Sequence, residues 1–452
     1  AEQRAKSDLA LTVASTAEKV VMIEAGANEV PEDKMIEAIF FGHETNQKLV
    51  AFINEIVAAV GKTKKPYEEH VVPEEVFAAL KTVCPPERME GAVFTDVKQT
   101  RDENIRVISA EFAEYIDTLP EDKQELYRSF ADEAIYQYQK KTVRKMIKVD
   151  GKRPDGRSFT QIRPLSAEVD CLPRVHGSGL FKRGQTQVLT VTTLGALSEC
   201  QLLDSLDESV DSKRYIHQYN MPSYSVGETK PSRGPGRREI GHGALAERAL
   251  EPMIPSVEEF PYAIRVVSEI LSSNGSTSQG SICGTTMALM DAGVPLKAPV
   301  AGISCGLIQD GDDFTTFIDI QGVEDFHGEM DFKVAGTKEG ITAIQMDLKN
   351  DGLKHEIVKE AFRITKEARF NILDEIMLKA IPETRKELAK TAPKMIQMQI
   401  NPDKIREVIG SGGKVIQKIT ADTGCKIDID DDGSIFIASE DIEACRAART
   451  II

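Results

Sequence analysis

The chain contains an internal repeat, which restricts the fold because segments with the same pattern of apolar residues build the same local structure. Val13–Thr16 reads Val-Ala-Ser-Thr, and Val334–Thr337 reads Val-Ala-Gly-Thr. Each copy predicts a strand, an acidic turn and an amphipathic helix. In this alignment Asp331 and Lys333 correspond to alanine and threonine in the first copy. The first copy therefore keeps the scaffold and lacks the charged side chains of the second.

The helix, strand and turn patterns divide the chain into four segments. Residues 1–61 contain only the last part of the repeat unit, so we expect an inactive remnant with an exposed strand edge and apolar face, and further sequence upstream in the parent protein. Residues 62–148 predict a helical linker domain that acts as a spacer, and residues 149–382 a domain of strands and helices. Residues 394–452 form a compact unit of their own. The expected fold class is α+β with several domains.

The composition, 41% apolar and 28% charged, is typical of a soluble globular protein. A formal net charge of −16 argues against a general polyanion binder, so nucleic-acid binding must rest on local basic patches. Seven scattered cysteines without a Cys-x-x-Cys pair favour reduced thiols in a cytosol-like compartment over disulfides or a zinc site. No stretch resembles a membrane span or a secretory signal, so we expect a cytoplasmic protein without a membrane partner.

The stretch from Gly322 to Lys333 is the most informative for chemistry. Asp331 and Lys333 lie two positions apart in a predicted strand, so their side chains point to one face. Asp325 precedes that strand in a predicted turn rich in glycine and acidic residues. Two carboxylates and a lysine together suit a divalent metal beside an anionic substrate. The alternative is a solvated acidic turn with an incidental salt bridge.

A second candidate site lies in Ser272–Gly280, between a predicted strand and a predicted helix over residues 282–292. Free backbone N–H groups at a helix N-terminus attract anions, and Ser276, Thr277 and Ser278 add hydroxyl donors. The segment is not a P-loop, because it lacks the Gly-Lys-Ser or Gly-Lys-Thr motif. The alternative is a simple helix cap.

Two arginines and a histidine occur together in a glycine-punctuated segment. Arg237 and Arg238 suit bidentate contacts with phosphate groups. His242 precedes a predicted helix over residues 244–250. The alternative is a pair of surface arginines with a capping or core histidine.

The last segment has the pattern strand-helix-loop-helix-strand-strand-helix, with Gly410-Ser411-Gly412-Gly413 as the loop between the first two helices. This order is that of a KH domain, in which the Gly-x-x-Gly loop clamps the backbone of a single strand. Lys414 and neighbouring lysines supply local positive charge in an acidic chain. The sequence therefore predicts an RNA-binding module here.

Together these segments resemble the polynucleotide phosphorylase family, whose core repeats the ribonuclease PH fold. The motifs that carry the resemblance occur in the family's order over nearly the whole chain, namely Arg153–Arg157, Phe181–Thr186, Pro222–Glu228, Arg237–His242, Ser273–Ser278 and Asp325–Lys333. The resemblance implies a ribonuclease PH-like core with an active second copy at 149–382, an all-helical linker domain and a KH domain.

The resemblance also implies an activity: phosphorolytic 3′-to-5′ degradation of single-stranded RNA, which releases nucleoside 5′-diphosphates, runs backwards as RNA polymerisation and serves mRNA turnover. It implies Mg²⁺ as the cofactor, with Mn²⁺ as a substitute, a homotrimeric ring and partners of the RNA degradosome type. It assigns catalysis to Asp325, Asp331, Lys333 and His242, the metal to Asp325 and Asp331, inorganic phosphate to Ser276, Thr277 and Ser278, and RNA to Arg237, Arg238, Gly410, Ser411, Gly412, Gly413 and Lys414.

The chain departs from the family pattern in several places. Most of the first core domain and the S1 domain after KH have no counterpart in this sequence. Thr277 replaces the middle serine of the phosphate turn and keeps the hydroxyl. Glu329 stands where aspartate is common, and we expect its carboxylate to stay near the metal.

Two other functions fit parts of the sequence. A hydrolytic 3′ exonuclease would have more metal-binding carboxylates and no phosphate turn. A non-catalytic RNA-binding ring subunit of an exosome-like assembly would have lost the Asp/Asp/Lys set, as the first copy has and the second has not.

Overall fold

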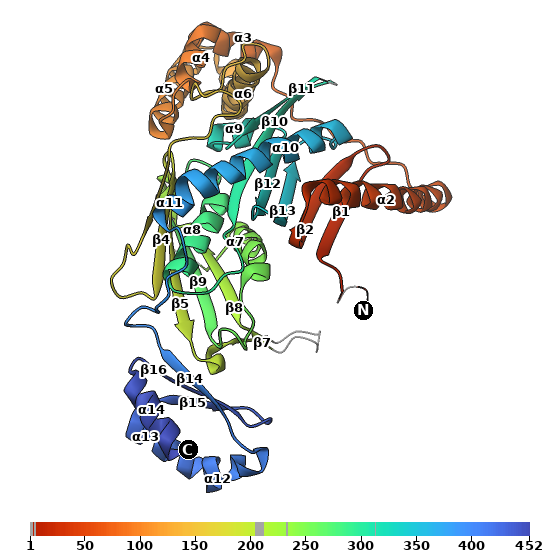
Figure 1. Cartoon of the computed structure of the whole chain (residues 1–452). Coiled ribbons are helices and arrows are strands. Elements are labelled where there is room, and N and C mark those ends of the chain that lie inside the picture. The colour runs from red at the N-terminus through yellow and green to blue at the C-terminus, as the bar shows by residue number, and fades with distance from the viewer. Residues whose placement is uncertain (1–2, 4–5, 204–211, 232–233, 312) are drawn as a thin grey trace.

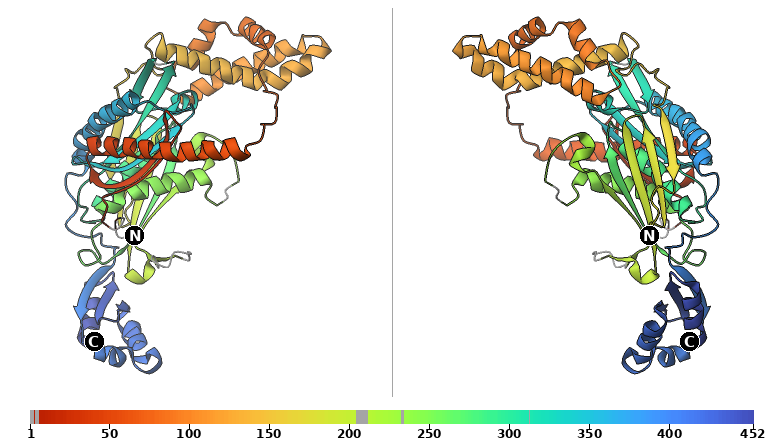
Figure 2. Two further views of the ribbon diagram at one scale, coloured as in Figure 1. Left: turned by 90° about the vertical axis from the view of Figure 1, so that its right-hand side faces the viewer. Right: turned by 90° about the vertical axis from the view of Figure 1, so that its left-hand side faces the viewer.

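The structure, a computed structural model, describes residue 3 and residues 6–203, 212–231, 234–311 and 313–452; residues 1–2 and 4–5 of the first predicted segment lie outside this set. Its parts follow one another along a single axis: a helical part, a central part with two large β-sheets, and a small α/β part at the C-terminus (Figure 1). The rotated views in Figure 2 show the long helix α2 (Glu32–Val60) crossing the central part. The predicted α+β class is confirmed.

The strands of the central part are β1 (Leu9–Ser15), β2 (Val20–Val30), β3 (Leu165–Val169), β4 (Gly177–Arg183), β5 (Thr186–Gly195), β6 (Gln201–Leu202), β7 (Ser212–Lys213), β8 (Tyr215–Asn220), β9 (Ala263–Ser272), β10 (Ala301–Asp310), β11 (Asp313–Ile318), β12 (Met330–Gly336) and β13 (Ile341–Leu348). Besides α2, its helices are α7 (Arg237–Leu250), α8 (Thr277–Asp291), α9 (Gly322–His327), α10 (His355–Ile372) and α11 (Leu378–Ala380).

The internal repeat is visible in the strand register. Leu9 of β1 pairs with Ala27 of β2, and the equivalent Met330 of β12 pairs with Leu348 of β13. Both hairpins also shift register at equivalent positions. Ala10 and Thr12 therefore occupy the places that Asp331 and Lys333 hold in the second hairpin, as the sequence alignment predicted.

Residues 1–61 are not a separate unit in this structure. Strand β2 pairs antiparallel with β13, which gives a six-stranded sheet in the order β1-β2-β13-β12-β10-β11. Glu24 pairs with Gln345, its own equivalent in the repeat, so a local pseudo-twofold axis relates the two hairpins. The hairpins of the two copies thus form part of one continuous sheet.

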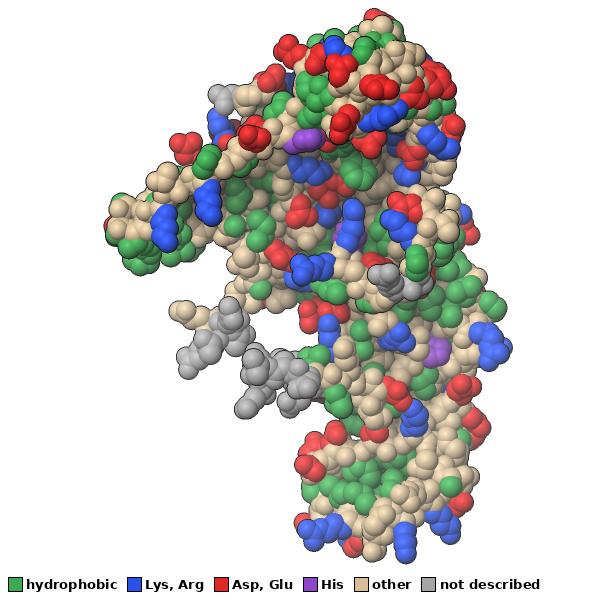
Figure 3. Space-filling model, turned by 180° about the vertical axis from the view of Figure 1, so that it is seen from behind, with side chains coloured by type: hydrophobic (Ala, Val, Ile, Leu, Met, Phe, Trp, Pro, Cys, Tyr) green, Lys and Arg blue, Asp and Glu red, His purple; other side chains and the backbone are tan. Residues whose placement is uncertain are grey.

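The exposed apolar face that we expected for the first segment is present. Strand β1 is the edge of the sheet, and α2 extends beyond it. Phe52, Ile53, Val57 and Val60 on the second half of α2 are each more than half exposed. Figure 3 shows these hydrophobic side chains gathered at the projecting end of the helix.

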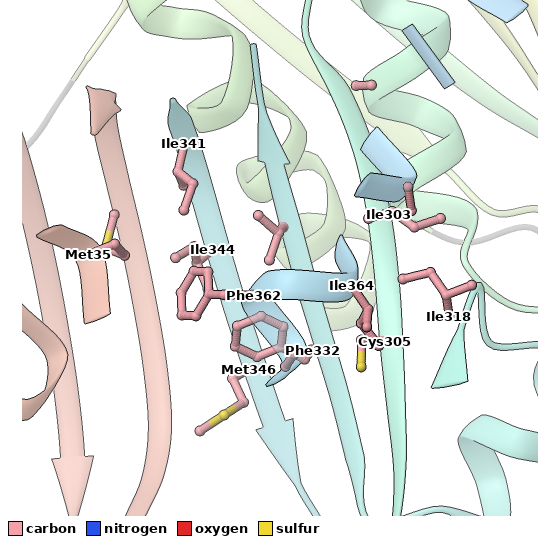
Figure 4. Close-up of a cluster of buried hydrophobic side chains, with 14 of the residues drawn as sticks. Met35, Ile303, Cys305, Ile318, Phe332, Ile341, Ile344, Met346, Phe362 and Ile364 are labelled. Carbon is pink, nitrogen blue, oxygen red and sulfur yellow. The ribbon is translucent and has the colours of Figure 1, made fainter. Parts of the chain in front are cut away.

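Helix α10 covers one face of the six-stranded sheet and completes its core. Phe362 of α10 packs edge-to-face on Phe332 of β12, with ring centroids 5.1 Å apart. Figure 4 shows Met346 of β13 beside these rings and Met35 of α2 on the side of the first copy. Burial of these side chains stabilises the sheet that carries Asp331 and Lys333.

A second sheet, in the order β3-β4-β5-β9-β8, lies opposite the first. Helix α8 is buried between the two sheets, in contact with β4, β5 and β10. It begins at Thr277, five residues before the start predicted from sequence. The predicted helix after His242 is likewise longer, since α7 begins at Arg237.

The helical part comprises α3 (Glu74–Val83), α4 (Pro86–Val93), α5 (Lys98–Asp117) and α6 (Glu121–Lys148). The predicted helices are confirmed, but the interpretation as a spacer is too simple. The Tyr136 hydroxyl donates to the carbonyl of Phe326 in α9 (3.3 Å), and the Arg144 guanidinium donates to the carbonyl of Gln309 (2.8 Å). The helical part therefore supports α9, the helix that carries Asp325.

The C-terminal part has the predicted KH order. A three-stranded sheet of β14 (Lys394–Gln399), β16 (Ser434–Ser439) and β15 (Lys426–Ile429) packs on α12 (Ile405–Ile409), α13 (Lys414–Thr423) and α14 (Ile442–Ile451). Within the described residues, no helix has the length and apolar character that crossing a bilayer requires.

The buried His217 in β8 gives a test of this fold by pH. Burial lowers the pKa of His217 from its ordinary value of 6.5 to about 3, so the native state keeps the ring neutral while the unfolded chain binds a proton. Stability should fall as the pH drops from about 6.5 towards 3, by about 1.4 kcal/mol per pH unit for this group. In denaturant titrations across this range, His217→Gln should lower the slope of unfolding free energy against pH by that amount. An unchanged slope would contradict the buried, neutral state.

Candidate active site

Asp331 and Lys333 form an ion pair on β12, in which Lys333 is buried and Asp331 is largely buried. The alternation of side chains along the strand places both on one face, as predicted, and Lys333 Nζ lies 2.9 Å from Asp331 Oδ2. The same ammonium donates to Gln345 Oε1 at 3.1 Å and lies 3.5 Å from Asp347 Oδ2. Lys333 is thus held by three acceptors, two of them on β13.

The surroundings shift the pKa values of this pair. Burial raises the pKa of Asp331 above its usual value; Lys333 opposes the shift, and the nearby Asp325 adds to it. Burial also disfavours the charge on Lys333, but Asp331 and Asp347 outweigh it and raise the pKa of the lysine. Asp331 Oδ1 is buried and has no hydrogen-bond partner among the described residues. This oxygen is therefore free to accept a proton or to ligate a cation.

Asp325 lies on a short helix and not in the predicted turn. Helix α9 begins at Gly322, and the side chain of Glu324 closes a capping box by accepting from the backbone N–H of Gln321. Lys349 Nζ donates to the Asp325 carbonyl and lies 3.3 Å from Asp325 Oδ1. Arg238 Nη2 lies 4.0 Å from Asp325 Oδ2.

Helix α7 brings the predicted arginines and histidine to the same place. Arg238 and His242 are four residues apart, so they lie on one face of the helix. A pocket of about 330 Å³ is lined by Arg237, Arg238, Gly241, His242, Asp325, Asp331, Lys333, Gln345, Asp347 and Lys349. Residues 237–242 and residues 325–349, which are at least 83 positions apart in the sequence, thus line one cavity.

His242 is neutral in this setting. Burial lowers the pKa of His242 to about 3, and the positive charges of Lys333 and Arg238 act in the same direction. Its ring packs edge-to-face on Tyr219, with centroids 5.1 Å apart, and Nδ1 has no partner among the described residues. A neutral imidazole at this position is able to donate or accept one hydrogen bond from a ligand in the pocket.

The residues Ser273–Ser276, which we call the serine turn, lead into α8. Ser276 is the N-cap of α8 and has a left-handed backbone (φ 58°). Its hydroxyl donates to the Ile320 carbonyl (2.7 Å) and lies 2.6 Å from Ser304 Oγ. Thr277 Oγ1 accepts from the Tyr219 hydroxyl (2.6 Å), which leaves the threonine proton free, and Ser278 is buried. The N–H groups of the first helical turn have no partner within the helix.

The serine turn and the acidic residues lie side by side. Ser304, which contacts Ser276, pairs with Lys333 across β10 and β12. At the other end of the turn, the backbone N–H of Gly322 in α9 donates to the carbonyl of Asn274 (3.2 Å). The N-terminus of α8 therefore contacts the start of α9, which carries Asp325, and β10, the strand that pairs with the strand of Asp331.

Sequence inspection missed Gln345 and Asp347, which lie on β13, and Lys349, which directly follows this strand. They reach the pocket because β13 pairs with β12 and places Asp347 opposite Asp331. Their alternate spacing along a strand was the available signal, since alternate residues share a face. The partner strand of β13 was not readable from the local sequence.

The expectation for Glu329 is wrong. Its carboxylate forms an ion pair with Arg144 of the helical part and accepts from the backbone N–H of Gln309 (3.0 Å). Glu329 is not among the residues that line the pocket. Glu329 directly precedes β12, and its side chain is long enough to pair with Arg144 of the helical part.

The residues present fit a divalent cation of the Mg²⁺ type. Asp325 and Asp331 line one pocket, and Asp331 presents an unpaired buried oxygen. Among the described residues, no group of three or more His, Cys, Asp or Glu side chains converges to form a full cage. Mg²⁺ keeps several waters and is held by one or two carboxylates together with substrate phosphates, so two acids suffice.

The KH loop has the backbone that its sequence predicts. Gly410, Gly412 and Gly413 all have positive φ values, of 73°, 65° and 77°. A Cβ on Gly410 would lie 2.4 Å from a Val415 methyl group, so only glycine fits there. Gly412 has open space around its Cα, where a backbone phosphate is able to approach.

Four family models match the chain in this order. The "3' exoribonuclease family, domain 2" matches residues 1–45, and the "Polyribonucleotide nucleotidyltransferase, RNA binding domain" matches residues 75–158. The "3' exoribonuclease family, domain 1" matches residues 161–295, and the "KH domain" matches residues 395–452. The first of these matches shows that residues 1–45 are similar in sequence to domain 2 of that family.

Curated relatives cover the whole chain. Proteins called polyribonucleotide nucleotidyltransferase are 62% identical in Lachnoclostridium phytofermentans, 56% in Ruminiclostridium cellulolyticum and 53% in Bacillus cytotoxicus, each over 100% of this chain. The chain spans 65%, 64% and 63% of the length of these relatives. An Archaeoglobus fulgidus exosome chain is 15% identical with a TM-score of 0.46 over 53% of this chain and 98% of its own length, which is too distant to support an argument.

Proposed function

Because the chain belongs to the polyribonucleotide nucleotidyltransferase family, we propose that it degrades single-stranded RNA from the 3′ end by phosphorolysis. Inorganic phosphate is the attacking group, and the products are a nucleoside 5′-diphosphate and an RNA shorter by one nucleotide. The observation that carries this proposal is the position of the serine turn beside the pocket of Asp325, Asp331 and Lys333.

In the proposed reaction, an oxygen of orthophosphate forms a bond to the phosphorus of the terminal phosphodiester. The bond from that phosphorus to the 3′ oxygen of the preceding nucleotide breaks, and this oxygen takes up a proton. The N–H groups at the start of α8, with Ser276, Thr277 and Ser278, hold the orthophosphate. Arg237 and Arg238 hold the RNA phosphates at the pocket. Such transfers depend mainly on positioning and on electrostatics.

Asp331 has the properties of a proton donor to the departing 3′ oxygen, because burial raises its pKa. Lys333 orients Asp331 and places a positive charge beside the reacting phosphate. His242 is neutral and positions the RNA end through a hydrogen bond. Asp325 and Asp331 are the residues that would hold Mg²⁺ or Mn²⁺, which neutralises phosphate charge when bound.

The KH part supplies a second binding site for the RNA. A change of charge in its loop tests this role. Gly412→Asp keeps a left-handed backbone that aspartate tolerates, and places a negative charge where phosphates bind. We expect affinity for single-stranded RNA to fall by about tenfold in a filter-binding assay, without loss of thermal stability.

Gly424→Asp is the matched control, because Gly424 has the same backbone (φ 70°) and open surroundings in the same unit, outside the loop. Equal loss of RNA affinity in both variants would show that the loop is not the contact.

The finer features of the family remain proposals for this chain: a homotrimeric ring, partners of the degradosome type, a role in mRNA turnover and a cytoplasmic location. The alternative of a non-catalytic ring subunit is disfavoured, because Asp325, Asp331 and Lys333 meet in one pocket.

The proposed activity is tested by incubating the chain with RNA, Mg²⁺ and phosphate and identifying the released nucleotide. Phosphate-dependent release of nucleoside diphosphates is the expected result. Monophosphates released without phosphate would indicate a hydrolytic exonuclease, and no release with intact RNA binding would indicate the non-catalytic alternative.

A further inference from the structure

We propose that Arg163 and Thr186 are positioning residues that hold the serine turn against the N-terminal end of α9, and so set the distance between the bound phosphate and Asp325. The inference rests on the proposed function, since it concerns the turn that would hold phosphate. Neither Arg163 nor Thr186 is among the residues that line the pocket.

Arg163 ties the turn to a buried carboxylate. Its Nη1 donates to the Asn274 carbonyl at 2.7 Å, while Nε and Nη2 donate to the two oxygens of Asp319 at 2.9 and 2.7 Å. Asp319 is fully buried and also accepts from Arg157 and Arg183. The guanidinium is thus fixed on one side, which makes its other side a rigid support for the turn.

Thr186 holds the peptide units on either side of the one that Arg163 contacts. Its hydroxyl donates to the Gly275 carbonyl (2.9 Å) and accepts from the Asn274 backbone N–H (2.9 Å). Thr186 is the first residue of β5 and is almost fully buried. Three successive peptide units of the turn are therefore fixed by side chains from outside it.

Helix α9 is also held by a buried arginine that contacts Asp319. Arg153 donates to both carboxylate oxygens of Glu324, each at 2.7 Å, and to the carbonyl of Asp319 (3.2 Å). A Cβ on Gly275 would lie 2.7 Å from the backbone nitrogen of Gly322, so the turn lies directly against the start of α9. The separation between the α8 N-terminus and Asp325 is set by these contacts.

The turn needs such support, because Ser276 has a left-handed backbone that a serine adopts at a cost. Backbone N–H groups bind an anion well only when their directions are held fixed. Loss of one anchor should therefore weaken phosphate binding while the RNA contacts of Arg237 and Arg238 are preserved.

Two pairs of variants test the inference. Arg163→Lys keeps a positive charge beside Asp319 but loses the guanidinium N–H that reaches Asn274. Arg183→Lys is the control, because Arg183 is also buried and binds Asp319 but not the turn. Thr186→Val removes both hydroxyl contacts; Thr190→Val makes the same change on the same strand, where the hydroxyl contacts Ser268.

For each variant, the Kd of orthophosphate is measured by calorimetry with Mg²⁺ present, along with the KM for phosphate, the Kd of RNA and the melting temperature. Arg163→Lys and Thr186→Val should raise the Kd and KM of phosphate by about tenfold. The two control variants should raise these values by less than about twofold. The Kd of RNA should be unchanged in all four variants. If Arg163→Lys does not fold, the threonine pair decides the result.

Equal phosphate affinities in target and control variants would overturn the inference, as would a parent chain that does not bind phosphate at all. A parent chain that binds phosphate with this variant pattern and releases no nucleoside diphosphate would refute the proposed function and leave the inference standing.

Discussion

Asp331→Asn is expected to lower the rate of phosphorolysis by about a thousandfold, because it removes the buried carboxylate that serves as proton donor and metal ligand. Asparagine has the same shape, so the strand and the contact with Lys333 should be preserved. Affinity for RNA should stay within about twofold, since the arginines and the KH loop provide those contacts. Single-turnover rates and filter binding measure the two effects separately.

Asp347→Asn is the matched control for this prediction. Asp347 lies opposite Asp331 on β13 and also contacts Lys333, but its side chain is 63% exposed. We expect a loss of less than about tenfold in rate, because an exposed charge is screened by water. If Asp331→Asn reduced RNA affinity as much as turnover, Asp331 would be part of the binding surface and not of the chemistry.

Asp319→Asn is expected to destabilise the central part by about 3–5 kcal/mol, because it leaves three buried arginines without their shared counter-ion. Asp319 has a left-handed backbone (φ 57°), which asparagine also tolerates, so the change isolates the charge. Despite burial, Arg163 and Arg183 hold the pKa of Asp319 well below its usual value. Its contribution is therefore present at pH 7 and is lost only as the pH falls through this low pKa.

Denaturant unfolding followed by circular dichroism measures this loss. Asp155→Asn is the comparison, because the Asp155 side chain is also nearly buried and, among the described residues, forms an ion pair with Arg157 alone. A destabilisation by Asp319→Asn no larger than that by Asp155→Asn would mean that the arginines are held in place by other contacts.

The sequence predicted the elements whose signal is local. The strand of Asp331 and Lys333, the KH order and the repeat follow from alternation, glycine positions and periodicity, and the structure shows them as expected. The starts of α7 and α8 were placed too late, because glycine, serine and threonine in a first helical turn resemble a loop. Helix α9 has six residues, fewer than periodicity can detect.

Features that depend on pairing between distant segments were not predictable. Asp347 and Lys349 reach the pocket only because β13 pairs with β12, and Glu329 leaves it because Arg144 of α6 is within reach. The Ser276 hydroxyl is directed to Ile320, a contact set by the close approach of α8 to the end of β11. Each of these contacts joins residues that are more than ten positions apart in the sequence, so the local sequence does not reveal it.

In the proposed reaction, phosphate bound at the serine turn attacks the RNA linkage beside Asp331. The most direct measurement is to supply ³²P-labelled orthophosphate with unlabelled RNA and Mg²⁺, and to locate the label in the released nucleotide. The label should appear in the β-phosphate of nucleoside diphosphates, and far less of it with Asp331→Asn. Release of unlabelled nucleoside monophosphates at the same rate would contradict the account.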